Sequence, residues 1–102
     1  MTSNILIAED DESLRRVVEY NLREEGYVVR TAKDGLEALA ALEREAPDLV
    51  LSDLRMPGAS GLEVLQAVRS RFPETEVILI TAHGMVDDAV RAMREGAFDF
   101  VT

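Results

Sequence analysis

Acidic residues follow two apolar runs of this sequence, and their types and spacing could carry chemistry. Glu9 and Asp10 come directly after the run Asn4–Ala8, and Asp53 follows the run Leu49–Leu51. Short apolar runs bounded by turn signals are typical of buried strands. Carboxylates gathered in one place repel one another, and a divalent cation removes that penalty. Oxygen ligands without imidazole or thiolate suit Mg²⁺. These residues therefore predict a magnesium site, provided that the fold brings them together.

The elements that must position these carboxylates alternate along the chain. Strand-like apolar runs are separated by amphipathic helical stretches, which indicates βαβ units, a parallel sheet and right-handed crossovers that place helices on both faces. In a doubly wound sheet of order 2-1-3-4-5, the first and third strands are neighbours, so Glu9, Asp10 and Asp53 would meet in one crevice. Thr81 would end the fourth strand on the far rim. The predicted strands are 4–8, 27–31, 49–53, 76–80 and 98–102.

The predicted helices each have an apolar face and a recognisable end. Asp34 with Glu37, and Ser60 with Glu63, have the spacing of capping boxes that begin helices. Gly26 is predicted to end a helix as a left-handed cap, and Gly96 is predicted to end the last helix. Helical spacing predicts the following inward residues: Leu14, Val17, Val18 and Leu22; Leu36, Leu39 and Leu42; Leu62, Leu65, Val68 and Phe72; Val86, Ala89, Val90 and Met93.

Composition bounds the class of protein. A chain of 102 residues predicts one domain, and a net charge of −9 argues against direct nucleic-acid binding, which needs clustered Lys and Arg. Cysteine is absent, which excludes disulfides and thiolate metal sites and fits a reducing cytoplasm. No run of 18 apolar residues and no basic-plus-apolar leader occurs, so neither a membrane span nor a secretory signal is expected.

Some of these residues have a structural interpretation instead. Residues 9–12 could be an acidic helix start favoured by the helix dipole, and we expect Asp11 and Glu12 to be only that. Thr81 could simply end a strand. His83, the one histidine, is expected to lie in a surface loop, because no metal ligand accompanies it in the sequence.

The chain resembles the receiver domain of bacterial two-component response regulators. The resemblance rests on Glu9-Asp10, on Asp53 with Met56-Pro57-Gly58 and Gly61, and on Thr81-Ala82, and it covers residues 1–102 as one domain. The segments 81–84 and 89–100 are most similar to receivers of NtrC-type transcriptional regulators. The resemblance implies an α/β, flavodoxin-like (CheY-like) fold with a doubly wound parallel five-stranded sheet of order 2-1-3-4-5.

Roles for single residues follow from the same resemblance. Asp53 would accept a phosphoryl group from a histidine kinase, so that the protein is a substrate of the kinase and not a turnover enzyme. Asp10, Asp53 and the backbone carbonyl of Arg55 would bind Mg²⁺, with Glu9 acting through water. Thr81 would donate its hydroxyl to the phosphoryl group. Phe100 would be the switch aromatic, although it could equally be an ordinary core residue.

One family feature is missing from this sequence. Receivers carry a lysine followed by proline at the end of the fifth strand, and that lysine would fall directly after Thr102. Lys33, the one lysine, is in the wrong place to replace it, in the loop after the second predicted strand. We therefore expect a receiver that lacks the last helix, with apolar surface bared and self-association as the result. The ATPase and DNA-binding output domains of NtrC-type regulators are also absent from this chain.

Two other kinds of function are compatible with parts of the sequence. The chain could be a protein-binding or dimerisation module that keeps the fold, has a vestigial acidic pocket and works without phosphorylation. It could also be a flavodoxin-like cofactor carrier or a small hydrolase. The last two are disfavoured, since the carboxylates after the first strand would repel a flavin phosphate and no Asp-x-Asp follows a strand.

Overall fold

The structure, a computed structural model, describes residues 3–80 and 86–101, except for the side chains of residues 86–88 and 100. Strands and helices alternate along the chain, as the sequence predicts. The second strand is shifted by one residue from its predicted position. The elements are β1 (Asn4–Ala8), α1 (Glu12–Glu24), β2 (Val28–Ala32), α2 (Gly35–Arg44), β3 (Leu49–Asp53), α3 (Gly61–Arg71), β4 (Glu76–Ile80), α4 (Val86–Arg94) and β5 (Asp99–Val101).

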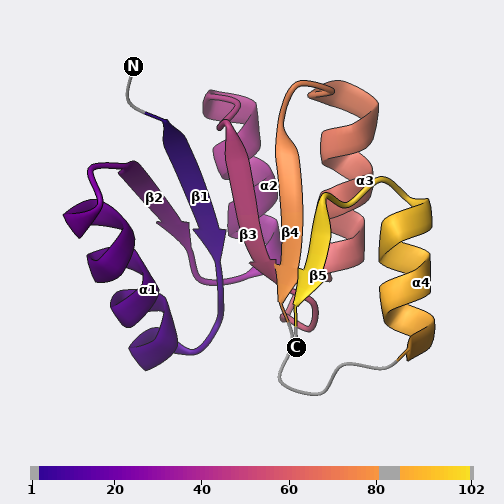
Figure 1. The fold of residues 1–102 in the computed structure, drawn as a ribbon, viewed down its shortest axis with the longest axis horizontal. Coiled ribbons are helices and arrows are strands. Elements are labelled where there is room, and N and C mark those ends of the chain that lie inside the picture. Colours follow the sequence, from indigo (N-terminus) through magenta and orange to yellow (C-terminus); the bar gives the residue numbers. More distant parts are fainter. Residues whose placement is uncertain (1–2, 81–85, 102) are drawn as a thin grey trace.

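The strands form one parallel sheet of order β2-β1-β3-β4-β5. The predicted order of the first four strands is confirmed, and the three residues of β5 pair with β4. All strands run the same way, so their carboxyl ends meet at one edge of the sheet (Figure 1). At this edge Ile7 pairs with Leu51, and Asp53 pairs with Ile80.

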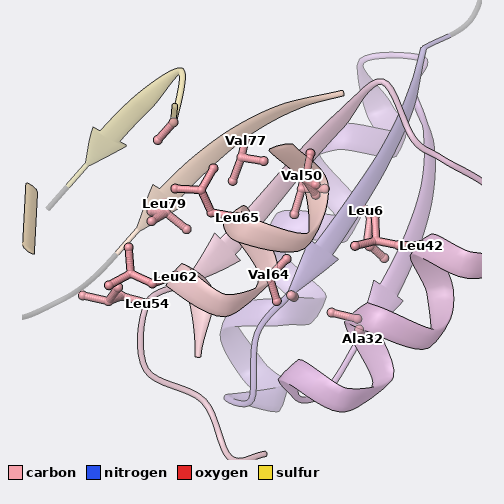
Figure 2. Packing of buried hydrophobic residues seen from close by; sticks show 14 of the residues in the cluster. Leu6, Ala32, Leu42, Val50, Leu54, Leu62, Val64, Leu65, Val77 and Leu79 are labelled. Carbon is pink, nitrogen blue, oxygen red and sulfur yellow. The ribbon is translucent and has the colours of Figure 1, made fainter. Parts of the chain in front are cut away.

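The main core lies between the sheet and the helices α2 and α3. Leu6, Val50, Val77 and Leu79 point from the strands towards these helices and are fully buried. Figure 2 shows them packed against side chains from both helices, among them Leu42, Val64 and Leu65. Ala92 of α4 belongs to the same cluster, so α4 covers this face too. The buried face of α3 is as predicted, with Leu62, Leu65 and Val68 buried and Phe72 packed against the cluster.

The opposite face of the sheet is covered only in part by the described elements. Val18 and Leu22 of α1 pack on a small cluster formed by Ile5, Ile7 and Val29. The prediction that Val17 points inward is wrong, because its side chain is 56% exposed. Leu14 is 46% exposed, although it lines a small cavity beside Val18 and Leu51. Helix α1 lies over β1 and β2, the two strands with which it makes its main contacts (Figure 1).

The central strands are therefore not buried on both faces, although the apolar run at Leu49–Leu51 favours that arrangement. Residues of β3 and β4 that face α2 and α3 are fully buried, whereas Leu51, Ile78 and Ile80 on the α1 side are half-buried. Val101 of β5 is 45% exposed and pairs with Ile80. We call Leu51, Ile78, Ile80, Val101, Leu14 and Val17 the open face.

Three further predictions about helix faces are wrong. Leu36 is 63% exposed, and α2 instead buries Gly35, Ala38 and Ala41 beside the correctly predicted Leu42. Val90 and Met93 of α4 are about half exposed, whereas Ala92 is buried. In each case a small residue faces the core, because a helix that lies close to its neighbour leaves room for a methyl group and not for a larger side chain.

The helix ends agree well with the sequence. Gly26 has a φ value of 96°, which confirms the predicted left-handed cap, and Gly96, which follows the end of α4 as predicted, has a φ value of 99°. Ser60 and Glu63 form the complete capping box. Asp34 caps α2 as predicted, but Glu37 accepts from the backbone N–H of Lys33 and not from that of Asp34. None of the helices in the described part of the chain is long and apolar enough to cross a lipid bilayer.

Candidate metal centre

The structure brings three of the predicted site residues together. Glu9 and Asp10 follow the end of β1, and Asp53 is the last residue of the neighbouring strand β3. One carboxylate oxygen of each residue lies within 4.8 Å of the others. Glu9 is buried, Asp53 is half-buried and Asp10 is exposed, so the cluster opens from the sheet edge towards solvent. The parallel order of the sheet, rather than proximity in sequence, creates this cluster.

The loop that carries Glu9 and Asp10 is fixed by hydrogen bonds. The Glu9 N–H donates to the carbonyl of Ala32 in β2 (3.0 Å), and the Asp11 N–H donates to the Glu9 carboxylate (3.1 Å). The Asp11 side chain accepts from the Leu14 N–H (3.1 Å) and so caps α1, which confirms the structural interpretation of Asp11. Arg15 donates through Nη1 to the Glu9 carbonyl (2.9 Å).

The loop after Asp53 is held by close backbone contacts. The Leu54 N–H donates to the Ile80 carbonyl (2.9 Å), and the Gly61 N–H donates to the Leu54 carbonyl (2.8 Å). A Cβ atom at Gly61 would lie only 2.5 Å from the carbonyl oxygen of Asp53. Helix α3 can therefore begin this close to the end of β3 only because its first residue has no side chain.

A second glycine holds the same loop from the other side. The Gly35 N–H, at the start of α2, donates to the Pro57 carbonyl (3.2 Å). A Cβ atom there would lie 1.8 Å from the carbonyl oxygen of Ala59. The starts of α2 and α3 thus fix the segment that leads away from Asp53.

Burial and charge both act on Glu9. The pKa of Glu9 is raised from 4.5 to about 7, mainly because burial desolvates the carboxylate. The neighbouring carboxyl groups of Asp10 and Asp53 also raise this pKa, whereas the hydrogen bond from the Asp11 N–H lowers it. The carboxyl group is therefore poorly compensated by the protein itself. A bound cation at this position would remove the repulsion and favour the charged form.

The donor set fits Mg²⁺. Glu9, Asp10 and Asp53 offer hard carboxylate oxygens, the ligands that Mg²⁺ prefers, and Mg²⁺ sites commonly keep several waters beside a few protein ligands. Within residues 3–80 and 86–101, this is the group of three or more acidic or histidine side chains that could hold a metal ion. The cluster is partly exposed, so such waters can reach it.

The described residues do not test the roles predicted for the remaining site residues. Arg55 is exposed in the loop two residues after Asp53, where its backbone carbonyl stays a predicted ligand. Thr81 and His83 lie outside the described residues, and so does the side chain of Phe100, whose backbone is part of β5.

Sequence patterns missed two residues that shape the centre. Arg15 belongs to the polar side of α1 by periodicity, yet its guanidinium turns back to the loop before the helix. Its position four residues after the cap Asp11 is the signal that could have found it. Gly35 directly follows the cap Asp34, at a position where other residues make better helices, and such a glycine indicates a close backbone approach.

Comparisons with known proteins agree with this geometry. Residues 5–102 match the profile of the response regulator receiver domain. The chain is 43% identical over 97 residues to the DNA-binding transcriptional regulator NtrC of Salmonella typhimurium, which covers 95% of this chain and 21% of the relative. The chain thus spans about a fifth of the length of this relative.

Solved structures share the fold. The chemotaxis protein CheY4 of Vibrio cholerae superposes with a TM-score of 0.90 at 31% identity, over 98% of this chain and 85% of that one. A response regulator protein from Burkholderia pseudomallei, solved with a phosphorylated aspartic acid and a calcium ion, superposes with a TM-score of 0.91 at 26% identity, over 97% and 58%. The predicted flavodoxin-like, CheY-like architecture is confirmed at this level.

Proposed function

Since this chain belongs to the family of response regulator receiver domains, we propose that residues 1–102 form one phospho-accepting receiver domain of a two-component system. Asp53 takes a phosphoryl group from the phosphohistidine of a histidine kinase, with Mg²⁺ as cofactor. The domain is a substrate of the kinase and not a turnover enzyme. We propose a cytoplasmic location, where kinase modules of this kind meet their receivers.

One observation carries the proposal: carboxylate oxygens of Glu9, Asp10 and Asp53 lie within 4.8 Å of one another at the carboxyl edge of the sheet. In open α/β sheets, ligands bind at this edge, beside the point where the strand order reverses. Here β1 and β3 are the strands at that point. The phosphorylated aspartic acid and cation in the relative from Burkholderia pseudomallei support the same chemistry for this family member.

The residues divide the work as follows. A carboxylate oxygen of Asp53 attacks the phosphorus atom, the P–N bond to the kinase imidazole breaks, and the imidazole leaves with the electron pair and takes a proton from water. Asp10, Asp53 and the Arg55 carbonyl would hold Mg²⁺, and Glu9 would act through water. The metal, when bound, neutralises charge on the phosphoryl oxygens. Thr81 would donate a hydrogen bond from its hydroxyl group to the acyl phosphate. Phe100 would act as the switch aromatic.

The output is proposed from the relatives. NtrC is a DNA-binding transcriptional regulator, and the chain matches about a fifth of it. We propose that this receiver controls transcription through further domains, and that the acidic chain itself, with a net charge of −9, does not contact DNA.

The test compares two aspartates of the same strand region. The chain is incubated with Mg²⁺ and acetyl phosphate, and phosphorylation is followed by intact mass. In a parallel sample, beryllofluoride mimics the phosphoryl group without transferring one, and its binding is followed by ¹⁵N–¹H NMR. Unsubstituted protein and the control Asp48→Ala, at the amino end of β3, should gain a hydroxylamine-sensitive phosphoryl group. Asp53→Ala should gain none. An identical response of Asp53→Ala and unsubstituted protein would remove the proposal.

The second candidate is a protein-binding module that works without phosphorylation. The observation in its favour is the open face, which exposes Leu14, Val17 and Val101. Under this function, self-association or partner binding is the same in the unsubstituted chain and in Asp53→Ala, with or without beryllofluoride.

A further inference from the structure

The peptide that joins Glu9 to Asp10 is anchored by a side chain from α1. The Arg15 guanidinium donates through Nη1 to the Glu9 carbonyl at 2.9 Å. Arg15 is half-buried, whereas the next residue, Arg16, is exposed and pairs with Glu12 on the surface. A half-buried, charge-assisted hydrogen bond of this kind is stronger than one between neutral groups and is more directional than a surface ion pair.

Other groups of the loop are held by backbone. The Glu9 N–H is paired with Ala32, the Glu9 carboxylate accepts from the Asp11 N–H, and the Asp11 carboxylate accepts from the Leu14 N–H. The Glu9 carbonyl, in contrast, accepts from a side chain, that of Arg15. Since a carbonyl and the following residue share one rigid peptide plane, the direction of this carbonyl sets the course of the chain into Asp10.

We propose that Arg15 is a positioning residue of the metal centre: its guanidinium fixes the Glu9–Asp10 peptide and thereby aims the Asp10 carboxylate at Glu9 and Asp53. The inference rests on the proposed function, because it concerns the same centre. Arg15 acts through the backbone and does not touch the metal or the phosphoryl group. Exposed Asp10 is the member of the cluster with the least burial to hold it, so it depends most on the backbone that carries it.

Two effects of Arg15 on cation binding have opposite signs, which makes the inference testable. As a positive charge near the centre, Arg15 repels Mg²⁺, so its removal would tighten binding. As an anchor of the Glu9–Asp10 peptide, it preorganises the ligands, so its removal would weaken binding. The sign of the change in Kd therefore tells positioning from simple charge.

The experiment uses the full 102-residue chain with Arg15→Gln, Arg15→Lys and the neighbouring control Arg16→Gln. The Kd for Mg²⁺ is measured by ¹⁵N–¹H NMR titration, and the thermal midpoint of each variant is recorded. We expect Arg15→Gln to raise the Kd about tenfold, the effect of one lost charge-assisted hydrogen bond. Arg15→Lys should recover part of this affinity, since an ammonium keeps a donor but loses the planar fork. Arg16→Gln should leave the Kd unchanged.

Amide hydrogen exchange in the metal-free protein gives an independent readout. In Arg15→Gln the amides of Asp10 and Asp11 should exchange faster, while those of β1 keep the protection seen in Arg16→Gln. A purely structural role would lower the thermal midpoint and protection throughout while the Kd stayed the same. An unchanged or tighter Kd in Arg15→Gln would overturn the inference.

Failure of the proposed function looks different. If the unsubstituted chain binds no Mg²⁺ at millimolar concentrations, the metal-dependent function falls, and hydrogen exchange alone decides whether Arg15 positions the loop. Equal exchange of Asp10 and Asp11 in Arg15→Gln and Arg16→Gln would then overturn the inference as well.

Discussion

Glu9 is buried beside two other carboxylates, and both burial and these neighbours raise its pKa, to about 7. The folded protein therefore favours the neutral form of this group well above the pH at which an exposed glutamate ionises. In the metal-free protein this makes Glu9 a destabilising residue at neutral pH, as is common where a site is built for a ligand rather than for stability.

The pH dependence of stability follows from this shift. The folded-state pKa lies above the ordinary value of 4.5, so the folded protein holds the proton more tightly than the unfolded chain. The contribution of Glu9 is fully present below pH 4.5 and is lost as the pH rises through about 7, with a slope no steeper than about 1.4 kcal/mol per pH unit. Denaturant unfolding of metal-free protein across this range should show the decline.

The control is Glu9→Gln, whose amide does not titrate. The free energy of unfolding of Glu9→Gln minus that of the unsubstituted chain should increase as the pH rises from 4.5 to 7, because the unsubstituted chain loses stability over this range. A constant difference across this range would show that Glu9 does not carry the dependence.

At this scale the sequence predicted the acidic cluster but not its supports. Glu9, Asp10 and Asp53 follow apolar runs that become adjacent strands, so topology alone predicts their meeting. The contact from Arg15 could not be predicted from periodicity, because helical spacing gives the direction of a side-chain stem and not the reach of a long guanidinium.

The first residues of α2 and α3 position these helices as much as packing in the hydrophobic core does. Helix α3 begins at Gly61 against the Asp53–Leu54 backbone, and α2 begins at Gly35 against the loop that follows. In both places a missing side chain permits backbone contact between a helix and the segment after β3. This loop is predicted to supply the Arg55 carbonyl to the metal.

Gly35→Ala should destabilise the protein. Alanine is ordinarily about 1 kcal/mol more favourable than glycine inside a helix. At Gly35, however, the new Cβ would lie 1.8 Å from the carbonyl oxygen of Ala59, so the loop must move. We expect a loss of about 1–3 kcal/mol in the free energy of unfolding, as for other overpacked sites, measured by denaturant titration.

Gly26→Ala is the matched control. Gly26 has a positive φ, and a Cβ atom at this position would meet no other atom within 4 Å, so the cost of the substitution is backbone strain alone, about 1 kcal/mol. Stabilisation by Gly35→Ala, the usual result in a helix, would contradict the steric account.

The existence and order of the elements could be predicted from the sequence, whereas several helix faces could not. Periodicity selected the large side chains Leu36, Val90 and Met93, but the structure buries Ala38 and Ala92. How closely a helix approaches its neighbour decides whether large or small residues face inward. That distance is a property of the packed molecule and is not encoded in the spacing of apolar residues.

The whole molecule is unevenly covered. Helices α2, α3 and α4 pack on one face of the sheet, while α1 lies over β1 and β2 on the other. The remaining part of that face carries half-buried Leu51, Ile78 and Ile80. Contiguous apolar surface of this kind favours association with another surface, which supports the sequence-based prediction of self-association.

Val17→Lys should reduce self-association of this chain. Val17 is 56% exposed on the open face, so a lysine there adds charge to the surface with little cost in packing. Light scattering should show a shift towards monomer, and binding of a hydrophobic dye should fall. The free energy of unfolding should change by no more than about 0.5 kcal/mol.

Tyr20→Lys is the control, because Tyr20 is 64% exposed on the same helix but is not part of the open face. It should leave both signals unchanged. A monodisperse monomer without dye binding in the unsubstituted chain would contradict the prediction.

A small cavity lies between the candidate metal centre and the open face. Its volume is about 70 Å³, and its walls include Leu14, Leu51 and Ile80 of the open face together with Glu9 and Asp53. A partner that covers Leu14, Leu51 and Ile80 would close this cavity and exclude water from one side of the carboxylates, lowering the local dielectric and strengthening their attraction for a cation. Occupancy of the two places is then thermodynamically linked, and the linkage is reciprocal: a partner that tightens metal binding is itself bound more tightly, by the same factor, when the metal is present.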